Sequence, residues 1–213
     1  MIKQYKNVFT KKECKKIINE CFIDLKKLLN TDPFSPEGNF IFIYDRKIMG
    51  TVLEKTDPRI EWLMLRLADI IGTSIDNLEY PRFKKYDEGG EYKRHYDFVF
   101  LDKPYAFSHL KTGGQRIKSH LIYLNDDFDG GFTEFPHWNV MVKPEVGKVL
   151  SWTNVKEGVP TNLKESIDLD SQHGGTSIKN GNKYIIIVFE KENKFIGETK
   201  DWFSRFKEEG HLP

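Results

Sequence analysis

A segment near the middle of the chain places an imidazole and a carboxylate two residues apart. His95 and Asp97 lie within residues 92–100, whose aromatic and β-branched content predicts a strand. Side chains alternate between the two faces of a strand, so His95 and Asp97 are expected to point into the same cavity. They would supply two of the three ligands of a two-His, one-carboxylate metal site, which suits non-haem Fe(II) chemistry with dioxygen.

Two residues far downstream complete this hypothesis. His173 is the candidate third ligand, provided that it lies on a strand adjacent to His95. Lys183 follows ten residues later and is the candidate cation for an anionic cosubstrate. Three protein ligands leave three positions of an octahedron open, enough for a cosubstrate and dioxygen together.

The other histidines of the central region are weaker candidates. His109 falls in an expected loop, His120 should face away from its neighbour Ser119, and His137 follows a proline at a turn. A zinc-dependent hydrolase is a further alternative, but no carboxylate is clearly placed as a general base.

Composition narrows the class of protein. The 213 residues are enough for one sizeable core, and the 33 basic and 32 acidic side chains nearly cancel. A balanced charge gives no field that favours nucleic acid or acidic membranes. No apolar run reaches the roughly 20 residues of a membrane span. We therefore expect no nucleic acid partner and no membrane partner, and composition leaves the oligomeric state unknown.

The cysteines indicate the compartment. Cys14 and Cys21 lie in one predicted helix, where seven residues span about 10 Å of axis. This exceeds the roughly 7 Å between Cα atoms that a disulfide can bridge, so both are expected to be free thiols. With no signal-peptide pattern at the N-terminus, these thiols predict a cytoplasmic protein.

Two helices are predicted before the metal-ligating segment. Thr10 and Glu13 form a capping-box pattern ahead of a stripe of apolar residues with helical spacing. Asp57 and Pro58 predict the start of a second helix that ends at Gly72. A turn is expected at residues 30–38 and a strand at residues 39–44.

From residue 79 onward the pattern is that of short strands divided by glycine-rich turns. This predicts a mainly β protein with N-terminal helices (α+β), with a barrel or jelly-roll core. Residues 184–189 are apolar on both faces and should form a central strand. Residues 101–115 and 153–171 are long enough to act as lids or binding loops.

In this order, the motifs make the sequence similar to a known family, the prolyl 4-hydroxylase type of Fe(II)- and 2-oxoglutarate-dependent dioxygenase. The resemblance runs from about residue 8 to residue 190. The matching segments are residues 9–14, Tyr86-Asp87-Glu88-Gly89, His95-Tyr96-Asp97, Gln115-Arg116-Ile117, residues 121–125, Gly130-Gly131-x-Thr133-x-Phe135-Pro136, Pro144-x-x-Gly147, Ser171-x-His173 and Gly181-x-Lys183.

The resemblance implies a double-stranded β-helix and assigns residues to its site. His95, Asp97 and His173 would hold the iron, and Lys183 would bind the outer carboxylate of 2-oxoglutarate with help from Tyr86 and Ser119. It further implies a single domain, 1–213. Within it, helical support would cover about 8–75, the β-helix core about 79–190, and a C-terminal tail 191–213.

The resemblance also implies an activity. The expected reaction is hydroxylation of prolyl residues, at the 4-position, in a protein or peptide, with decarboxylation of 2-oxoglutarate to succinate. Fe(II), 2-oxoglutarate and dioxygen would be required, and ascorbate is an additional expected reductant. The sequence departs from the family pattern at Phe132, at residues 176–178 and at Tyr184, which leaves the target open.

Other functions remain alternatives at this stage. The same chemistry on another residue, a free amino acid or a small molecule would use the same ligands. A non-catalytic peptide-binding scaffold would not require two histidines, an aspartate and a lysine together. The related nucleic-acid demethylases are disfavoured by the balanced charge and by Lys183, because that group resembles users of arginine for the cosubstrate.

Overall fold

The computed structural model describes residues 1–29, 41–45, 47–104 and 106–197, with backbone alone for residues 23–29 and 41–45. The strands form a seven-stranded sheet, a four-stranded sheet and a two-stranded ribbon, and all the pairings are antiparallel. In spatial order, the large sheet is β1 (Ile2–Tyr5), β10 (Val149–Thr153), β6 (Arg116–Tyr123), β13 (Lys183–Lys191), β4 (Arg82–Tyr86), β3 (Ile48–Val52) and β2 (Ile41–Asp45). The small sheet is β5 (Tyr92–His95), β11 (His173–Gly175), β8 (Thr133–Phe135) and β9 (Val140–Val142), and the ribbon is β12 (Ile178–Asn180) with β7 (Asp129–Gly130).

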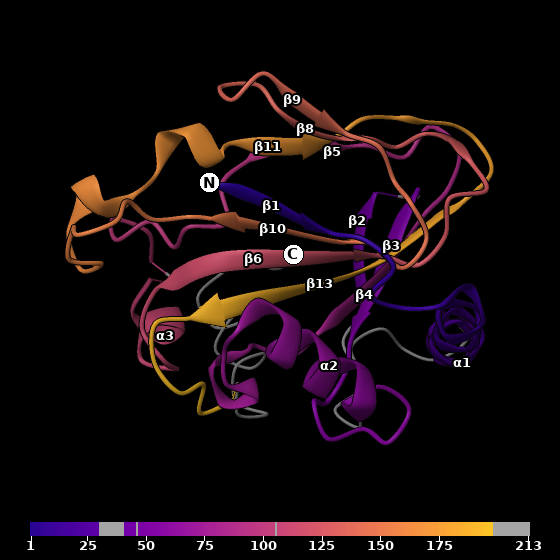
Figure 1. Cartoon of the computed structure of the whole chain (residues 1–213), viewed down its shortest axis with the longest axis horizontal. Coiled ribbons are helices and arrows are strands. Elements are labelled where there is room, and N and C mark those ends of the chain that lie inside the picture. Colours follow the sequence, from indigo (N-terminus) through magenta and orange to yellow (C-terminus); the bar gives the residue numbers. More distant parts are fainter. Residues whose placement is uncertain (30–40, 46, 105, 198–213) are drawn as a thin grey trace.

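Helices cover one face of the large sheet and the small sheet covers the other (Figure 1). The helices are α1 (Lys11–Leu29), α2 (Glu61–Ile71) and α3 (Ala106–Leu110), with 3-10 turns at Ile75–Asn77, Lys164–Ser166 and Leu169–Ser171. This is the predicted mainly β architecture, two sheets packed face to face as in a jelly roll.

The start of α1 follows the predicted capping box. The Thr10 amide donates to the Glu13 carboxylate at 2.8 Å, and the Glu13 amide donates to the Thr10 hydroxyl at 3.2 Å. Each side chain therefore satisfies a backbone donor of the first turn. Arg66 of α2 donates to the same carboxylate at 2.9 Å, which ties the two helices together.

The predicted start of α2 is wrong by three residues. Asp57 does not cap the helix, because its carboxylate accepts from the Arg59 amide and guanidinium in a turn that precedes it. The helix begins at Glu61, after Ile60. Its predicted end is confirmed, since Gly72 adopts the left-handed conformation with φ of 71°.

Two cores lie on opposite faces of the large sheet. The first joins the helices to the sheet, and the second lies between the two sheets. The first includes Ile17, Leu63, Met64, Ile122, Ile186 and Val188. The second includes Leu121, Phe135, Leu150, Trp152, Ile185 and Ile187. The β13 strand contributes alternate side chains to both, which confirms its predicted central position.

Several features lay beyond the sequence predictions. Strands β1 and β3 and helix α3 were not predicted, and α3 occupies part of the segment expected to be a long loop. The turn predicted at residues 30–38 and the tail beyond residue 197 lie outside the described residues. Both cysteines are free and buried, as predicted. Across the described ranges, no helix has the length and apolar character needed to cross a membrane.

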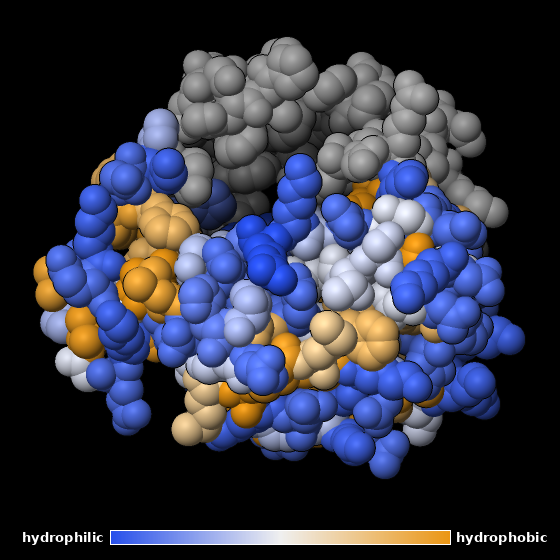
Figure 2. Space-filling model, turned by 90° about the horizontal axis from the view of Figure 1, so that it is seen from above, coloured by the Kyte–Doolittle hydropathy of each residue, from blue (hydrophilic) through white to orange (hydrophobic). Residues whose placement is uncertain are grey.

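The distribution of apolar residues between surface and interior agrees with these two cores. On the face shown in Figure 2, hydrophilic residues dominate and apolar residues gather in small groups. Apolar side chains are instead concentrated in the two cores, where burial stabilises the fold.

Candidate active site

Two neighbouring strands of the small sheet bring the two candidate histidines together. His95 ends β5, His173 begins β11, and the antiparallel register pairs them directly. Their ring centroids lie 4.3 Å apart. The expectation that the second imidazole lies on a strand adjacent to the first is therefore confirmed.

Asp97 also lies beside the two histidines, but strand alternation does not place it there. The strand was expected to continue to residue 100, but β5 ends at His95, so strand alternation does not explain how the aspartate points toward the histidines. Its partner β11 has only three residues, which leaves no ladder beyond His95. The Gln115 side chain holds the following backbone instead, accepting from the Val99 amide at 2.8 Å and donating to the Val99 carbonyl at 2.9 Å.

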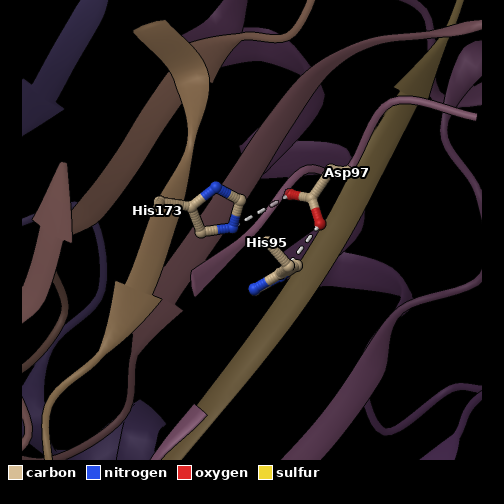
Figure 3. Close-up of side chains that lie close together, drawn as sticks. All are labelled: His95, Asp97 and His173. Carbon is tan, nitrogen blue, oxygen red and sulfur yellow. Dashed lines mark ion pairs between the residues drawn. The ribbon is translucent and has the colours of Figure 1, made fainter. Parts of the chain in front are cut away.

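The three side chains converge as a metal-ligand set. Oδ1 of Asp97 lies 3.4 Å from Nε2 of His95, and Oδ2 lies 3.4 Å from Nε2 of His173. Figure 3 shows the carboxylate pointing toward both imidazoles. One ligand atom from each residue lies within 4.8 Å of the other two. Two nitrogens and one oxygen at this spacing match the facial triad of non-haem Fe(II) sites.

Hydrogen bonds orient each of these ligands. Nδ1 of His95 lies 2.8 Å from the Lys93 carbonyl, and Nδ1 of His173 lies 2.9 Å from the Ser171 carbonyl. A carbonyl only accepts, so each Nδ1 carries the proton and each Nε2 keeps a lone pair for a metal.

Electrostatics favour the protonation states that a metal requires. Burial opposes the charge of Asp97, but His173, His95 and the Ser119 hydroxyl outweigh it and hold the pKa of this carboxyl well below its usual range. Burial lowers the pKa of His173, against the attraction of Asp97. A carboxylate beside a neutral imidazole is the form in which both groups bind a cation.

The ligands open into a cavity of about 210 Å³ between the two sheets. Its walls combine aromatic and aliphatic side chains with cationic side chains from β4, β6 and β13. They include Tyr86, Tyr92, Trp152, Ile185, Ile187 and Phe189, and the cations are Arg82, Lys84, Arg116 and Lys183. A cavity in which several polar groups converge between apolar walls is typical of a ligand site.

Lys183 lies in this cavity, at the start of β13. Its ammonium donates to the Gly131 carbonyl at 2.7 Å and lies 5.4 Å from the Tyr86 ring centroid and 5.5 Å from that of Tyr123. Burial, with a smaller contribution from Lys84, lowers the pKa of Lys183 to about 7. A cation so poorly solvated gains most from an anionic ligand.

The double glycine of the sequence motif makes room for this lysine. Gly131 has φ of 64°, and a Cβ there would lie 2.6 Å from Cδ1 of Ile178 and 3.2 Å from Cδ of Lys183. Any larger residue would therefore meet both a strained backbone and the lysine stem.

The two residues predicted to assist Lys183, Tyr86 and Ser119, have different surroundings. Tyr86 lines the cavity beside Lys183, in register with it across β4 and β13. Ser119 has another contact, because its hydroxyl donates to Oδ2 of Asp97 at 2.6 Å and accepts from Asn154 at 2.9 Å. Ser119 is not among the residues that line the cavity, so the structure gives it a role in orienting the aspartate.

The remaining candidates are not part of the metal-ligand set. His120 is buried between Ser151, at 2.8 Å, and Glu190, at 3.2 Å. Burial lowers the pKa of His109 to about 3, and His137 is exposed. Arg94 is exposed and pairs with Glu134 on the surface.

Sequence reasoning missed three cavity residues on β4 and β5. Arg82, Lys84 and Tyr86 occupy every second position of β4 and therefore lie on the same face of the strand. Tyr92 begins β5, which ends at His95. The period-two rule applied to Tyr86 would have found the first two. Arg116, within the Gln115-Arg116-Ile117 segment, also lines the cavity and pairs with the buried Glu79 at 2.7 Å.

Comparison with known families agrees with this geometry. The model of the 2OG-Fe(II) oxygenase superfamily matches residues 81–190, which contain all the proposed ligands. The chain belongs to this superfamily, whose name specifies Fe(II) and 2-oxoglutarate. Two imidazoles with free Nε2 atoms, a carboxylate and a buried cation in one cavity are the groups that this pair requires.

Curated relatives carry related names. The chain is 31% identical over 152 residues to rat prolyl 4-hydroxylase subunit alpha-1, covering 70% of this chain and 26% of that protein. It is 30% identical over 198 residues to Arabidopsis thaliana prolyl 4-hydroxylase 5, covering 84% and 64%. The chain thus spans about a quarter of the length of the animal relatives it matches.

Solved structures share the fold. A viral collagen prolyl hydroxylase from Paramecium Bursaria Chlorella virus-1, in its 2OG complex, superposes with a TM-score of 0.67 at 19% identity, covering 91% of this chain and 96% of that one. A Trichoplax adhaerens prolyl hydroxylase with a hypoxia inducible factor peptide gives 0.57 at 15% identity, covering 90% and 83%. These likenesses agree with the predicted double-stranded β-helix.

Proposed function

We propose that this chain hydroxylates prolyl residues, at the 4-position, in a protein or peptide. Each turnover would consume dioxygen and 2-oxoglutarate and would release succinate and carbon dioxide with the hydroxylated residue. The observation that carries the proposal is the meeting of His95, Asp97, His173 and Lys183 at one cavity. The relatives named prolyl 4-hydroxylase support the choice of substrate.

The proposed roles follow from the contacts. His95, Asp97 and His173 would hold Fe(II), which when bound supplies the redox chemistry that couples decarboxylation of 2-oxoglutarate to hydroxylation of a C–H bond. The backbone carbonyls on both Nδ1 atoms keep the imidazoles in the ligating tautomer. The Ser119 hydroxyl orients the Asp97 carboxylate.

Lys183 would bind the outer carboxylate of 2-oxoglutarate. Its ammonium lies in the cavity between two tyrosine rings, where water is largely excluded and a charge pair is strong. Tyr86 would pack against the carbon chain of the cosubstrate, and the aromatic walls would keep water from the reacting atoms.

The alternatives have less support. Among the described residues that line the cavity, Asp97 is the acidic one, and it belongs to the ligand set. A zinc hydrolase would require a second carboxylate or a similar base beside its metal-bound water. A scaffold would have no need for the hydrogen bonds that orient the three ligands.

The first test is an anaerobic titration of metal-free protein with Fe(II) and 2-oxoglutarate, monitored by the charge-transfer absorbance of the chelated keto acid. The wild type should develop the band, and His173→Ala should lose it. His137→Ala is the matched control, because that histidine is exposed and outside the ligand set, and it should retain the band. Tight Zn(II) binding with no band in the wild type would contradict the proposal.

A second test concerns the target. Proline-containing peptides incubated with the loaded enzyme should gain the mass of one oxygen atom, located on proline by fragmentation. The predicted requirement for ascorbate can be checked in the same assay by omitting it. Oxygen added to another residue, or turnover with a free amino acid alone, would replace the prolyl assignment.

We also propose a single domain that works in the cytoplasm. Support for the single domain comes from β1, at the N-terminal end, which pairs with β10 of the core. Support for a reducing compartment comes from Cys14 and Cys21, which are free and buried. Burial raises the pKa of Cys14 to about 11, so this thiol resists oxidation.

A further inference from the structure

We propose that Lys84 recognises a carboxylate of the substrate, so that the preferred target is a prolyl substrate bearing an acidic group close to the hydroxylated residue. The inference rests on the proposed function, because it names the substrate class of the same site. It concerns a lysine that the reaction described above does not use.

The position of Lys84 places it beside the metal ligands. It lies on the cavity face of β4, two residues before Tyr86, with only 8% of its surface exposed. Its ammonium lies 4.4 Å from the Tyr92 ring centroid, and that ring lies 4.5 Å from the His95 ring. One aromatic side chain therefore separates the ammonium from a metal ligand, which is where the reacting part of a substrate must bind.

The charges of the cavity explain why an anionic group is expected there. Fe(II) and Lys183 carry three positive charges, and Asp97 and doubly ionised 2-oxoglutarate carry three negative charges. The cosubstrate thus balances the metal centre without Lys84.

The two arginines of the cavity share one buried anion. Arg116 and Arg82 both donate to the Glu79 carboxylate, at 2.7 and 3.1 Å. Both guanidinium groups stack over the Phe189 ring, at 3.9 and 5.0 Å from its centroid. The cations still outnumber the acids along the cavity, and the ammonium of Lys84 lies over the Tyr92 ring.

The state of the lysine agrees with this assignment. Burial, together with the nearby Arg82, lowers the pKa of Lys84 to about 7, although Asp97 opposes the shift. An incoming carboxylate would stabilise the ammonium form and replace its lost hydration. A polar or apolar substrate would exclude water from the ammonium without supplying an opposite charge.

The test uses acetylated and amidated peptides Gly-Asp-Pro-Gly-Gly and Gly-Gly-Pro-Asp-Gly, each with its Asn counterpart. A third pair, proline and prolinamide, tests whether the carboxylate belongs to a free amino acid. Binding to the anaerobic Fe(II) and 2-oxoglutarate complex is measured by calorimetry, and succinate formation is measured separately. The wild type should bind at least one acidic member about tenfold or more tightly than its amide, the range expected for a charge-assisted contact.

Variants test whether the Lys84 side chain causes the preference for acidic members. Lys84→Met should abolish the preference and Lys84→Arg should retain it. Lys85→Met is the matched control, because the adjacent lysine lies on the opposite face, over the Phe22 ring and paired with Asp87. It should keep the wild-type preference.

Three results would overturn the inference. They are equal binding or no binding of acidic and amide members by the wild type, a preference that survives in Lys84→Met, and loss of the charge-transfer band in Lys84→Met alone. The last would show that Lys84 binds the cosubstrate instead. Absence of the band in the wild type would overturn the proposed function itself, and this inference with it.

Discussion

The two faces of the seven-stranded sheet contain very different side chains. The face under α1 and α2 is mainly apolar, and Ile122, Ile186 and Val188 are fully buried there. The opposite face holds lysines, arginines and aromatic rings around His95, Asp97 and His173. Because β13 supplies both faces through strand alternation, stability is concentrated on one side of the sheet and chemistry on the other. Variants on the two faces should therefore have separable effects.

The largest expected effect is on the cavity face. Lys183→Met should weaken 2-oxoglutarate binding by about 2–5 kcal/mol, because a buried carboxylate loses its cation. At pH 6 and without ligands, the same variant should unfold at a higher temperature, since burying the ammonium destabilises the wild type. Anaerobic calorimetry and thermal unfolding measure the two quantities. Unchanged 2-oxoglutarate affinity would remove Lys183 from the cosubstrate site.

On the helix-covered face, Ile186→Ala should lower the free energy of unfolding by about 3 kcal/mol, because it leaves a cavity in a close-packed core. The charge-transfer band should persist in the folded variant. The neighbouring Ile185→Ala changes a residue that lines the cavity, so it should destabilise less, and chemical denaturation of both variants measures the difference. Equal losses would mean that the two faces are packed alike.

The affinity for 2-oxoglutarate should also depend on pH, because Lys183 lies on the cavity face. Without an anion the pKa of Lys183 lies at about 7, so the ammonium that binds a carboxylate is lost as the pH rises through that value. The affinity for 2-oxoglutarate should then fall by up to about tenfold per pH unit above 7, as single-proton linkage requires. Lys183→Arg should remove this dependence, because guanidinium stays charged. A flat profile in the wild type would show that the lysine does not titrate there.

The smallest effect should come from the helix cap, far from the cavity. Arg66, followed by the Thr10 amide, lowers the pKa of Glu13 to about 2. A carboxyl with a lowered folded pKa stabilises the protein above its ordinary value of 4.5, and this contribution disappears as the pH falls toward 2. Glu13→Gln should therefore cost about 1 kcal/mol at pH 7 and almost nothing at pH 2, by denaturation at both pH values. A loss that persists at pH 2 would point to packing.

Local signals were sufficient for some elements of the fold. Thr10 and Glu13 contact each other within one turn, so the capping box predicted the start of α1. Gly72 likewise ended α2 as predicted. Asp57 gave the wrong start for α2 because Arg59, two residues away, competes for its carboxylate. A pattern that fits a helix start does not reveal such a competitor.

The site required both kinds of information. Residue types and order predicted His95, Asp97, His173 and Lys183 as site residues, but the register that pairs the two histidines is a long-range property. Asp97 lies near both histidines as predicted, but strand alternation does not place it there, because β5 ends at His95. Strand alternation from Tyr86 places Lys84 on the same face of β4, but only the folded structure shows that this face lines the cavity.

The pairing of β5 with β11 has a consequence for how the chain folds. These strands lie far apart in sequence, so a long loop must close before the two imidazoles meet. Contacts of such high sequence separation form slowly, and the unfolded chain offers Fe(II) no assembled set of ligands. Iron should therefore bind late in folding and selectively to the native state, raising the apparent stability by mass action as its concentration exceeds the dissociation constant. Depletion of iron would then lower the lifetime of the protein as well as its activity.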